Sequence, residues 1–305
     1  MRLLAALAVV IPLGLGTTLP VPADNPLTDE KIELGRQLFN DRRLSSDGTV
    51  ACASCHDPER AFTKPEAVSP GVRGRKGQRN APTVINRAWG RVFFWDGRSP
   101  TLEDQVLKPI QDPNEMDLSL EEASRRVNLP PADMARALAS YIRSLVAGNS
   151  PYDRFTNGER TALSPDERNG LRVFQGRGNC IICHEGPNLT DEKLHNTGVA
   201  WLAADERGGT TGRFLDDGGM TVTGLATDRG AFKTPTLRDV GKTAPYMHDG
   251  SLATLEDVVD FYDRGGRANP ALDHDMERLD LPEDDKRALV AFLKTALLSG
   301  LPAAR

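Results

Sequence analysis

Every cysteine of this 305-residue chain lies in one of two motifs of the form Cys-x-x-Cys-His. The two motifs contain Cys52, Cys55 and His56, and Cys180, Cys183 and His184. This spacing is the covalent attachment signal of a c-type haem, because two thioethers tether the macrocycle and the adjacent imidazole reaches the iron. A redox dithiol would not require the histidine, and a zinc site would need further ligands nearby. The sequence therefore predicts two covalent c-type haems.

The N-terminus is typical of an exported protein. Arg2 precedes an apolar stretch over 3–13 and then small residues and prolines, which predicts a secretory signal peptide over 1–23, cleaved after Ala23. An uncleaved anchor is the alternative, but the apolar stretch is short for a bilayer span. We expect a periplasmic protein that is not integral to the membrane. Its net charge of −5 argues against a nucleic-acid partner.

Similar helical sequences flank the two motifs. Residues 35–39 match residues 170–174 before the motifs, with apolar side chains at helical spacing, and 136–142 match 287–293 after them. Residues 164–167, Ser-Pro-Asp-Glu, are a capping box that would begin one of these helices. Strand signals are sparse. We predict a mainly α fold with two cytochrome c-like haem domains in tandem and long loops, divided at 24–148 and 149–305.

Three further segments carry a family resemblance. They are Phe94–Arg98, followed by Gln105, Pro109 and Glu115; Arg79–Thr83; and Thr243–Gly250. Together they resemble the bacterial dihaem cytochrome c peroxidase family, which includes the MauG-type enzymes. The resemblance extends from about Asn25 to the final helix, so it covers nearly the whole predicted mature chain.

The resemblance implies a role for each matching residue. The N-terminal domain would hold the peroxidatic haem, with His56 on its iron, and the C-terminal domain would hold the electron-transfer haem, with His184 on its iron. Gln105 and Glu115 match the pocket that receives hydrogen peroxide, where a carboxylate can move a proton between the two oxygens. Trp95 matches a tryptophan that relays electrons between the haems. The matches to a calcium site between the domains are Asn80, Thr243 and Pro245.

Two departures from the ordinary peroxidases are informative. Those enzymes carry a histidine between the first haem motif and the Arg-Asn-x-Pro-Thr segment, where it caps the peroxidatic iron, whereas residues 57–78 here contain no histidine. We therefore expect the first haem to be open at rest. The second departure is Tyr262, at the position of the methionine that ligates the second haem. Tyr262 is the expected ligand, with Met247 the alternative and His248 also chemically able.

These departures favour the MauG-like, MbnH-like subtype. Such an enzyme reacts with hydrogen peroxide and draws electrons from a protein partner, typically from Trp, through a bis-Fe(IV) state. The alternative is a cytochrome c peroxidase that reduces peroxide with electrons from a small cytochrome c or cupredoxin, and a lesser one is a non-catalytic dihaem carrier. MauG has a surface tryptophan, on its electron-transfer route, two residues before the second haem motif, and this chain has Gly178 at that position. Trp89 or Trp201 would have to take over that role. Homodimers are common in the family. We expect His195 and His274 to be surface or loop histidines.

Overall fold

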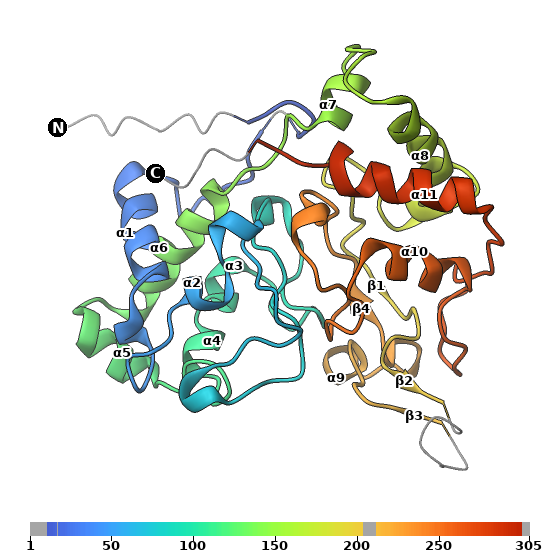
Figure 1. Cartoon of the computed structure of the whole chain (residues 1–305). Helices are drawn as coiled ribbons and strands as arrows, with labels where there is room; N and C mark the ends of the chain where they lie inside the picture. The colour runs from blue at the N-terminus through green and yellow to red at the C-terminus, as the bar shows by residue number, and fades with distance from the viewer. Residues whose placement is uncertain (1–10, 17, 204–211, 301–305) are drawn as a thin grey trace.

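Helices and long loops make up most of the chain. The computed structural model describes residues 11–16, 18–203 and 212–300 (Figure 1). The α-helices of the N-terminal half are α1 (Asp29–Phe39), α2 (Cys52–Cys55), α3 (Leu102–Gln105), α4 (Lys108–Gln111), α5 (Leu120–Val127) and α6 (Pro131–Ser144). Those of the C-terminal half are α7 (Pro151–Thr156), α8 (Pro165–Gln175), α9 (Met220–Thr223), α10 (Leu255–Asp263) and α11 (Glu283–Ala291). The predicted mainly α fold is confirmed.

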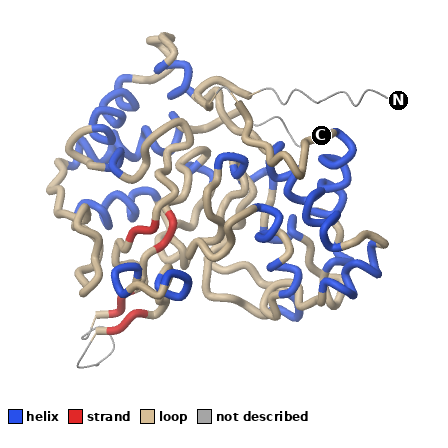
Figure 2. The backbone as a smooth tube through the Cα atoms, turned by 180° about the vertical axis from the view of Figure 1, so that it is seen from behind, coloured by secondary structure: helices blue, strands red, loops and turns tan. Residues whose placement is uncertain are grey.

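The strands of the described residues belong to the C-terminal half, and the view from behind shows how short they are (Figure 2). β1 (Leu194–His195) pairs antiparallel with β4 (Phe232–Lys233), and β2 (Trp201–Leu202) pairs antiparallel with β3 (Arg213–Phe214). Each of these strands has only two residues, so the pairs connect neighbouring loops and do not form a sheet that could carry a hydrophobic core.

Both halves contain the same close crossing of two helices. In the N-terminal half α1 packs on α6, and in the C-terminal half α8 packs on α11. A Cβ atom on Gly35 would lie 2.0 Å from the carbonyl oxygen of Ala137, and a Cβ atom on Gly170 would lie 2.0 Å from the carbonyl oxygen of Ala288. Only glycine permits backbones to approach this closely. The sequence repeat thus corresponds to a repeated tertiary contact.

The helix starts follow local rules. Ser164 accepts a hydrogen bond from the Glu167 amide at 3.2 Å, and the Glu167 carboxylate accepts one from the Ser164 amide at 2.7 Å, which is the predicted capping box. Thr254 and Asp257 form the same box at the start of α10. α11 begins with three acidic residues, Glu283–Asp285, where the positive end of the helix dipole favours them.

Two separate hydrophobic clusters stabilise the two halves. Residues of the first cluster lie between 38 and 147, and those of the second lie between 163 and 297. The expected domain boundary at 148/149 falls between them. In Figure 1 the blue-to-green helices α1, α5 and α6 lie on one side and the green-to-red helices α8, α10 and α11 lie on the other.

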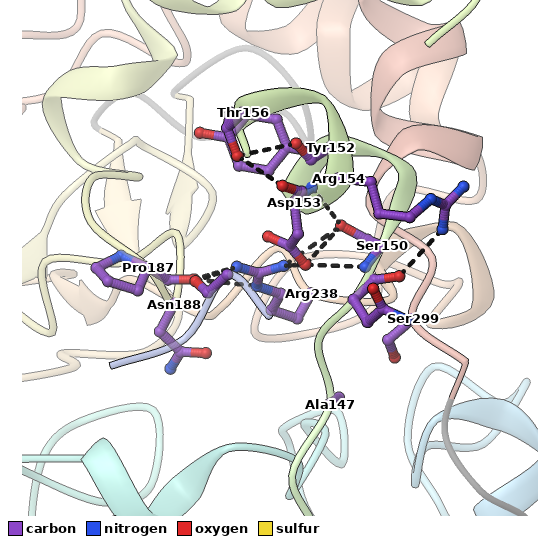
Figure 3. A network of polar contacts seen from close by, with 12 residues as sticks. Ala147, Ser150, Tyr152, Asp153, Arg154, Thr156, Pro187, Asn188, Arg238 and Ser299 are labelled. Atoms are coloured by element: carbon purple, nitrogen blue, oxygen red, sulfur yellow. Dashed lines mark hydrogen bonds and ion pairs between the residues drawn. The ribbon is translucent and has the colours of Figure 1, made fainter. Parts of the chain in front are cut away.

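A buried ion pair anchors the segment that joins the halves (Figure 3). The Arg238 side chain is fully buried and donates to the Asp153 carboxylate at 2.6 Å. Asp153 also accepts from the amide and the hydroxyl of Ser150, both at 2.9 Å, in a capping box that begins α7. The segment that joins the halves is therefore fixed at Ser150 and Asp153.

No described helix is both long enough and apolar enough to cross a membrane. Most of the apolar part of the predicted signal peptide, residues 1–10, lies outside the described residues.

Candidate functional site

The two Cys-x-x-Cys-His motifs adopt matching geometry. The amide of His56 donates to the carbonyl of Cys52 at 3.0 Å, and the amide of His184 donates to the carbonyl of Cys180 at 2.9 Å. Each turn therefore brings the histidine back beside the first cysteine of its own motif. None of the four cysteines forms a disulfide, so all four are available for thioether bonds.

Both histidines are oriented by a backbone carbonyl. The Nδ1–H of His56 donates to Phe62 at 3.0 Å, and that of His184 donates to Leu189 at 2.9 Å. These bonds leave each Nε2 as the ligating nitrogen. Burial lowers the pKa of His56 and lowers that of His184 to about 4, so both rings are neutral imidazoles. The arrangement fits two c-type haems.

A cavity of about 230 Å³ adjoins the second motif. Cys180, Cys183 and His184 line one part of it, and both predicted distal ligands, Tyr262 on α10 and Met247, also line it. Burial raises the pKa of the Tyr262 phenol in the absence of a metal. The cavity thus brings Tyr262 and Met247 to the same haem site, and the choice between them stays a prediction.

Trp95 belongs to the N-terminal half but lines the cavity of the second motif. Its indole Nε1–H donates to the carbonyl of Asn80 at 2.8 Å, and its own carbonyl accepts from the Lys233 amide at 2.7 Å. The first bond orients the indole ring, and the second joins the Trp95 backbone to the C-terminal half. The position suits the predicted electron relay, whose role stays a prediction.

A second cavity, of about 260 Å³, contains the proposed acid–base residue Glu115. Its other lining residues are Phe94, Arg98, Lys108, Pro109, Gln111 and Asp112. Burial and, to a smaller extent, the Asp112 charge raise the pKa of Glu115 from 4.5 to about 7, against the opposing effect of Arg98. The Glu115 charge in turn contributes to raising the pKa of Cys52 and Cys55, which places it near the first motif.

Gln105 does not line the Glu115 cavity. It is the last residue of α3 and is half-buried. Its predicted role beside Glu115 stays a prediction.

The histidine-free loop is docked beside Glu115. The amide of Val72 donates to the carbonyl of Glu115 at 2.8 Å, and Gly71 packs so closely that a Cβ atom would lie 2.1 Å from the carbonyl oxygen of Asn114. Arg73 and Arg75 pair with Asp117 at 2.8 and 3.0 Å. These exposed ion pairs connect the loop to the segment that follows Glu115.

The predicted calcium ligands offer unused oxygens. Asn80, Thr243 and Pro245 line the cavity of the second motif. Among the described residues, no hydrogen bond reaches Asn80 Oδ1 or the carbonyl oxygens of Thr243 and Pro245, while the Asn80 amide nitrogen donates to Ala67 at 3.1 Å. Neutral oxygens of this kind suit a hard cation. The set fits calcium, and occupancy stays a prediction.

His195 is not the surface or loop histidine that the sequence suggested. Its Nδ1 lies 2.6 Å from the Asp273 carboxylate, its Nε2 lies 2.9 Å from the Asp191 carboxylate, and it lines the cavity of the second motif. Asp191 is four residues earlier, but no sequence signal connects Asp273 to this site. His248 is buried and stacks on Phe232, with 3.6 Å between ring centroids. His274 is exposed, as predicted.

Comparisons with known proteins identify the family. Residues 29–132 match the family model for di-haem cytochrome c peroxidase. The chain is 37% identical to the methylamine utilization protein MauG of Methylorubrum extorquens, over 94% of this chain and 83% of that protein. It is 34% identical to the cytochrome c551 peroxidase of Nitrosomonas europaea, over 90% of this chain and 82% of that protein.

The fold is similar to that of a MauG-like protein associated with microbial copper homeostasis. The TM-score is 0.84 at 33% sequence identity, over 96% of this chain and 94% of that one. The family's description as di-haem agrees with the two haem motifs, and the chain belongs to the di-haem cytochrome c peroxidase family of enzymes, which includes MauG.

Proposed function

We propose that this enzyme is a periplasmic, MauG-like oxidoreductase that reacts with hydrogen peroxide at an open first haem and draws electrons from a protein partner through the second. When bound, the haems supply the iron that meets peroxide and the redox centre that stores oxidising equivalents. Cys52, Cys55 and His56 hold the first haem. The second is held by Cys180, Cys183, His184 and Tyr262, with calcium on Asn80, Thr243 and Pro245.

The observation that carries the proposal is the docked loop beside Glu115. Residues 57–78 contain no histidine, and the Val72–Glu115 bond with the two arginine pairs to Asp117 fixes the loop in place. Residues 57–78 therefore supply no histidine that could cap the iron of the first haem. Peroxide needs no prior reduction of the second haem to reach the first iron.

Glu115 is suited to the proton transfer that peroxide cleavage requires. Glu115 would accept a proton from one peroxide oxygen and return it to the other. With a pKa of about 7, both its protonated and its ionised forms are populated near neutral pH, so both transfers are accessible. We assign the transfer of electrons between the halves to Trp95, and its place in the wall of the second cavity supports this role.

Two features support the MauG-like assignment over an ordinary peroxidase. Tyr262 lines the second cavity, and an anionic phenolate on the iron would disfavour reduction by a small donor protein. The likeness to the MauG-like protein of copper homeostasis makes a copper-handling protein the first class of partner to test. The similarity to cytochrome c551 peroxidase and the presence of Met247 in the same cavity favour the alternative, reduction of peroxide with electrons from a small cytochrome c or cupredoxin.

One experiment separates these alternatives. One equivalent of hydrogen peroxide is added to the fully oxidised, haem-loaded protein while EPR, optical and near-infrared spectra are recorded. We expect both ferric EPR signals to be lost together and a long-lived near-infrared charge-resonance band to form. A protein that reacts only after one haem has been reduced would overturn the open-haem assignment and favour the ordinary peroxidase.

A further inference from the structure

Lys233 is a buried lysine in the wall of the second haem cavity. It lies on β4, its side chain is 9% exposed, and it is one of the residues that line the cavity with His184 and Tyr262. The ammonium group donates one hydrogen bond, to the backbone carbonyl of Thr234 at 3.0 Å. A lysine at this depth normally has a close anionic partner, because burying an uncompensated charge is costly.

The nearest carboxylate is already committed to another cation. Glu192 lies 3.8 Å from the Lys233 ammonium, but it receives two hydrogen bonds from Arg87, at 2.7 and 2.9 Å. Asp191, the next acidic neighbour, accepts from His195 at 2.9 Å. Within the described ranges, no carboxylate lies within hydrogen-bonding distance of Lys233.

The missing anion can come from the cofactor. A c-type haem attached at Cys180 and Cys183 must occupy the cavity that these residues share with Lys233. Haem carries two propionate groups, which are anionic at neutral pH. We propose that Lys233 binds a propionate of the second haem and raises the reduction potential of that haem.

The direction of the effect follows from charge. Reduction adds one negative charge to the haem, and a buried cation nearby stabilises the reduced form over the oxidised form. Lys233 therefore opposes the lowering effect of an anionic ligand such as the Tyr262 phenolate. The inference rests on the second haem being bound in this cavity and does not depend on which electron donor the enzyme uses.

Spectroelectrochemical titration of the haem-loaded protein tests the proposal. In Lys233→Met we expect the ferric-to-ferrous ratio of the second haem at a fixed potential to rise at least tenfold, equivalent to a downward midpoint shift of about 59 mV. The midpoint of the first haem should not move. Lys233→Arg keeps the charge and should stay close to wild type.

Lys193→Met is the matched control. Lys193 immediately precedes β1, the strand that pairs with β4, and its side chain is 69% exposed, so the same substitution there should change neither midpoint. An unchanged second midpoint in Lys233→Met, or a shift as large in Lys193→Met, would overturn the proposal.

The pyridine haemochrome assay first establishes that Lys233→Met, Lys233→Gln and Lys233→Arg each carry two haems, because the thioether bonds hold each haem independently of any propionate contact. Lys233→Gln is the second neutral variant, and its second midpoint should fall as in Lys233→Met. An unchanged second midpoint in Lys233→Gln would overturn the proposal. The peroxide reaction of the diferric protein tests the proposed function in a separate measurement. An unchanged midpoint in Lys233→Met would therefore overturn the role of Lys233 without affecting the proposed function.

Discussion

The pH dependence of the reaction with peroxide is the sharpest prediction from the Glu115 pocket. Burial raises the pKa of Glu115 to about 7, and the base that accepts the first peroxide proton is its carboxylate form. The rate should therefore rise with pH through 7. From the titration equation, about 1% of the groups are ionised at pH 5 and about 90% at pH 8, so the rate should increase about 90-fold over this interval. A carboxyl group with the ordinary value of 4.5 would change by only about 1.3-fold.

Stopped-flow mixing of the diferric protein with peroxide between pH 5 and 8.5 measures this profile. Two neighbours should move its midpoint in opposite directions. Removing the Arg98 charge, in Arg98→Leu, should move the midpoint above 7, and removing the Asp112 charge, in Asp112→Asn, should move it below 7. Glu115→Gln should flatten the profile and lower the rate by about 10²–10⁴-fold.

Protein stability gives an independent check of the same pKa shift. Because folding raises the pKa of Glu115, its contribution to stability is fully present below about 4.5 and is lost as pH rises through about 7. Glu115→Gln should therefore gain stability over wild type as pH rises across that window. A rate that is flat with pH, or that has its midpoint near 4.5, would refute the assignment of Glu115 as a desolvated base.

The remaining predictions concern packing and ligation. Gly170→Ala would place a methyl group 2.0 Å from the carbonyl oxygen of the facing helix and should lower the free energy of unfolding by about 1–3 kcal/mol in urea titrations, whereas Gly77→Ala, with open space around it, should have little effect. Tyr262→Phe should change the EPR spectrum of the second ferric haem and Met247→Leu should not; the reverse result would assign the ligand to Met247. Arg238→Met leaves a buried carboxylate without its partner and should cost about 3–5 kcal/mol, measured by chemical denaturation; a loss below about 1 kcal/mol would contradict a structural role for the pair.

Features set by neighbouring residues could be predicted from the sequence. Covalent haem attachment needs two thiols and an imidazole within one turn, so the paired motifs carry that chemistry in contiguous residues. The Ser164 capping box is also local, and the structure has it as predicted. The repeated sequences predicted similar helices before and after each motif, because apolar spacing reports which face of a helix is buried.

Only the tertiary structure decided which distant residues meet and how deeply they are buried. Trp95 lies in the wall of a cavity built mostly from the other half of the chain, and His195 bridges carboxylates that are 82 residues apart, Asp191 and Asp273. The raised pKa of Glu115 and the burial of Lys233, whose nearest carboxylate lies 3.8 Å away, both depend on every element packed around these side chains. Spacing along the chain determines which groups can bind a haem, whereas packing across the chain determines the charge and the proton affinity of the groups around it.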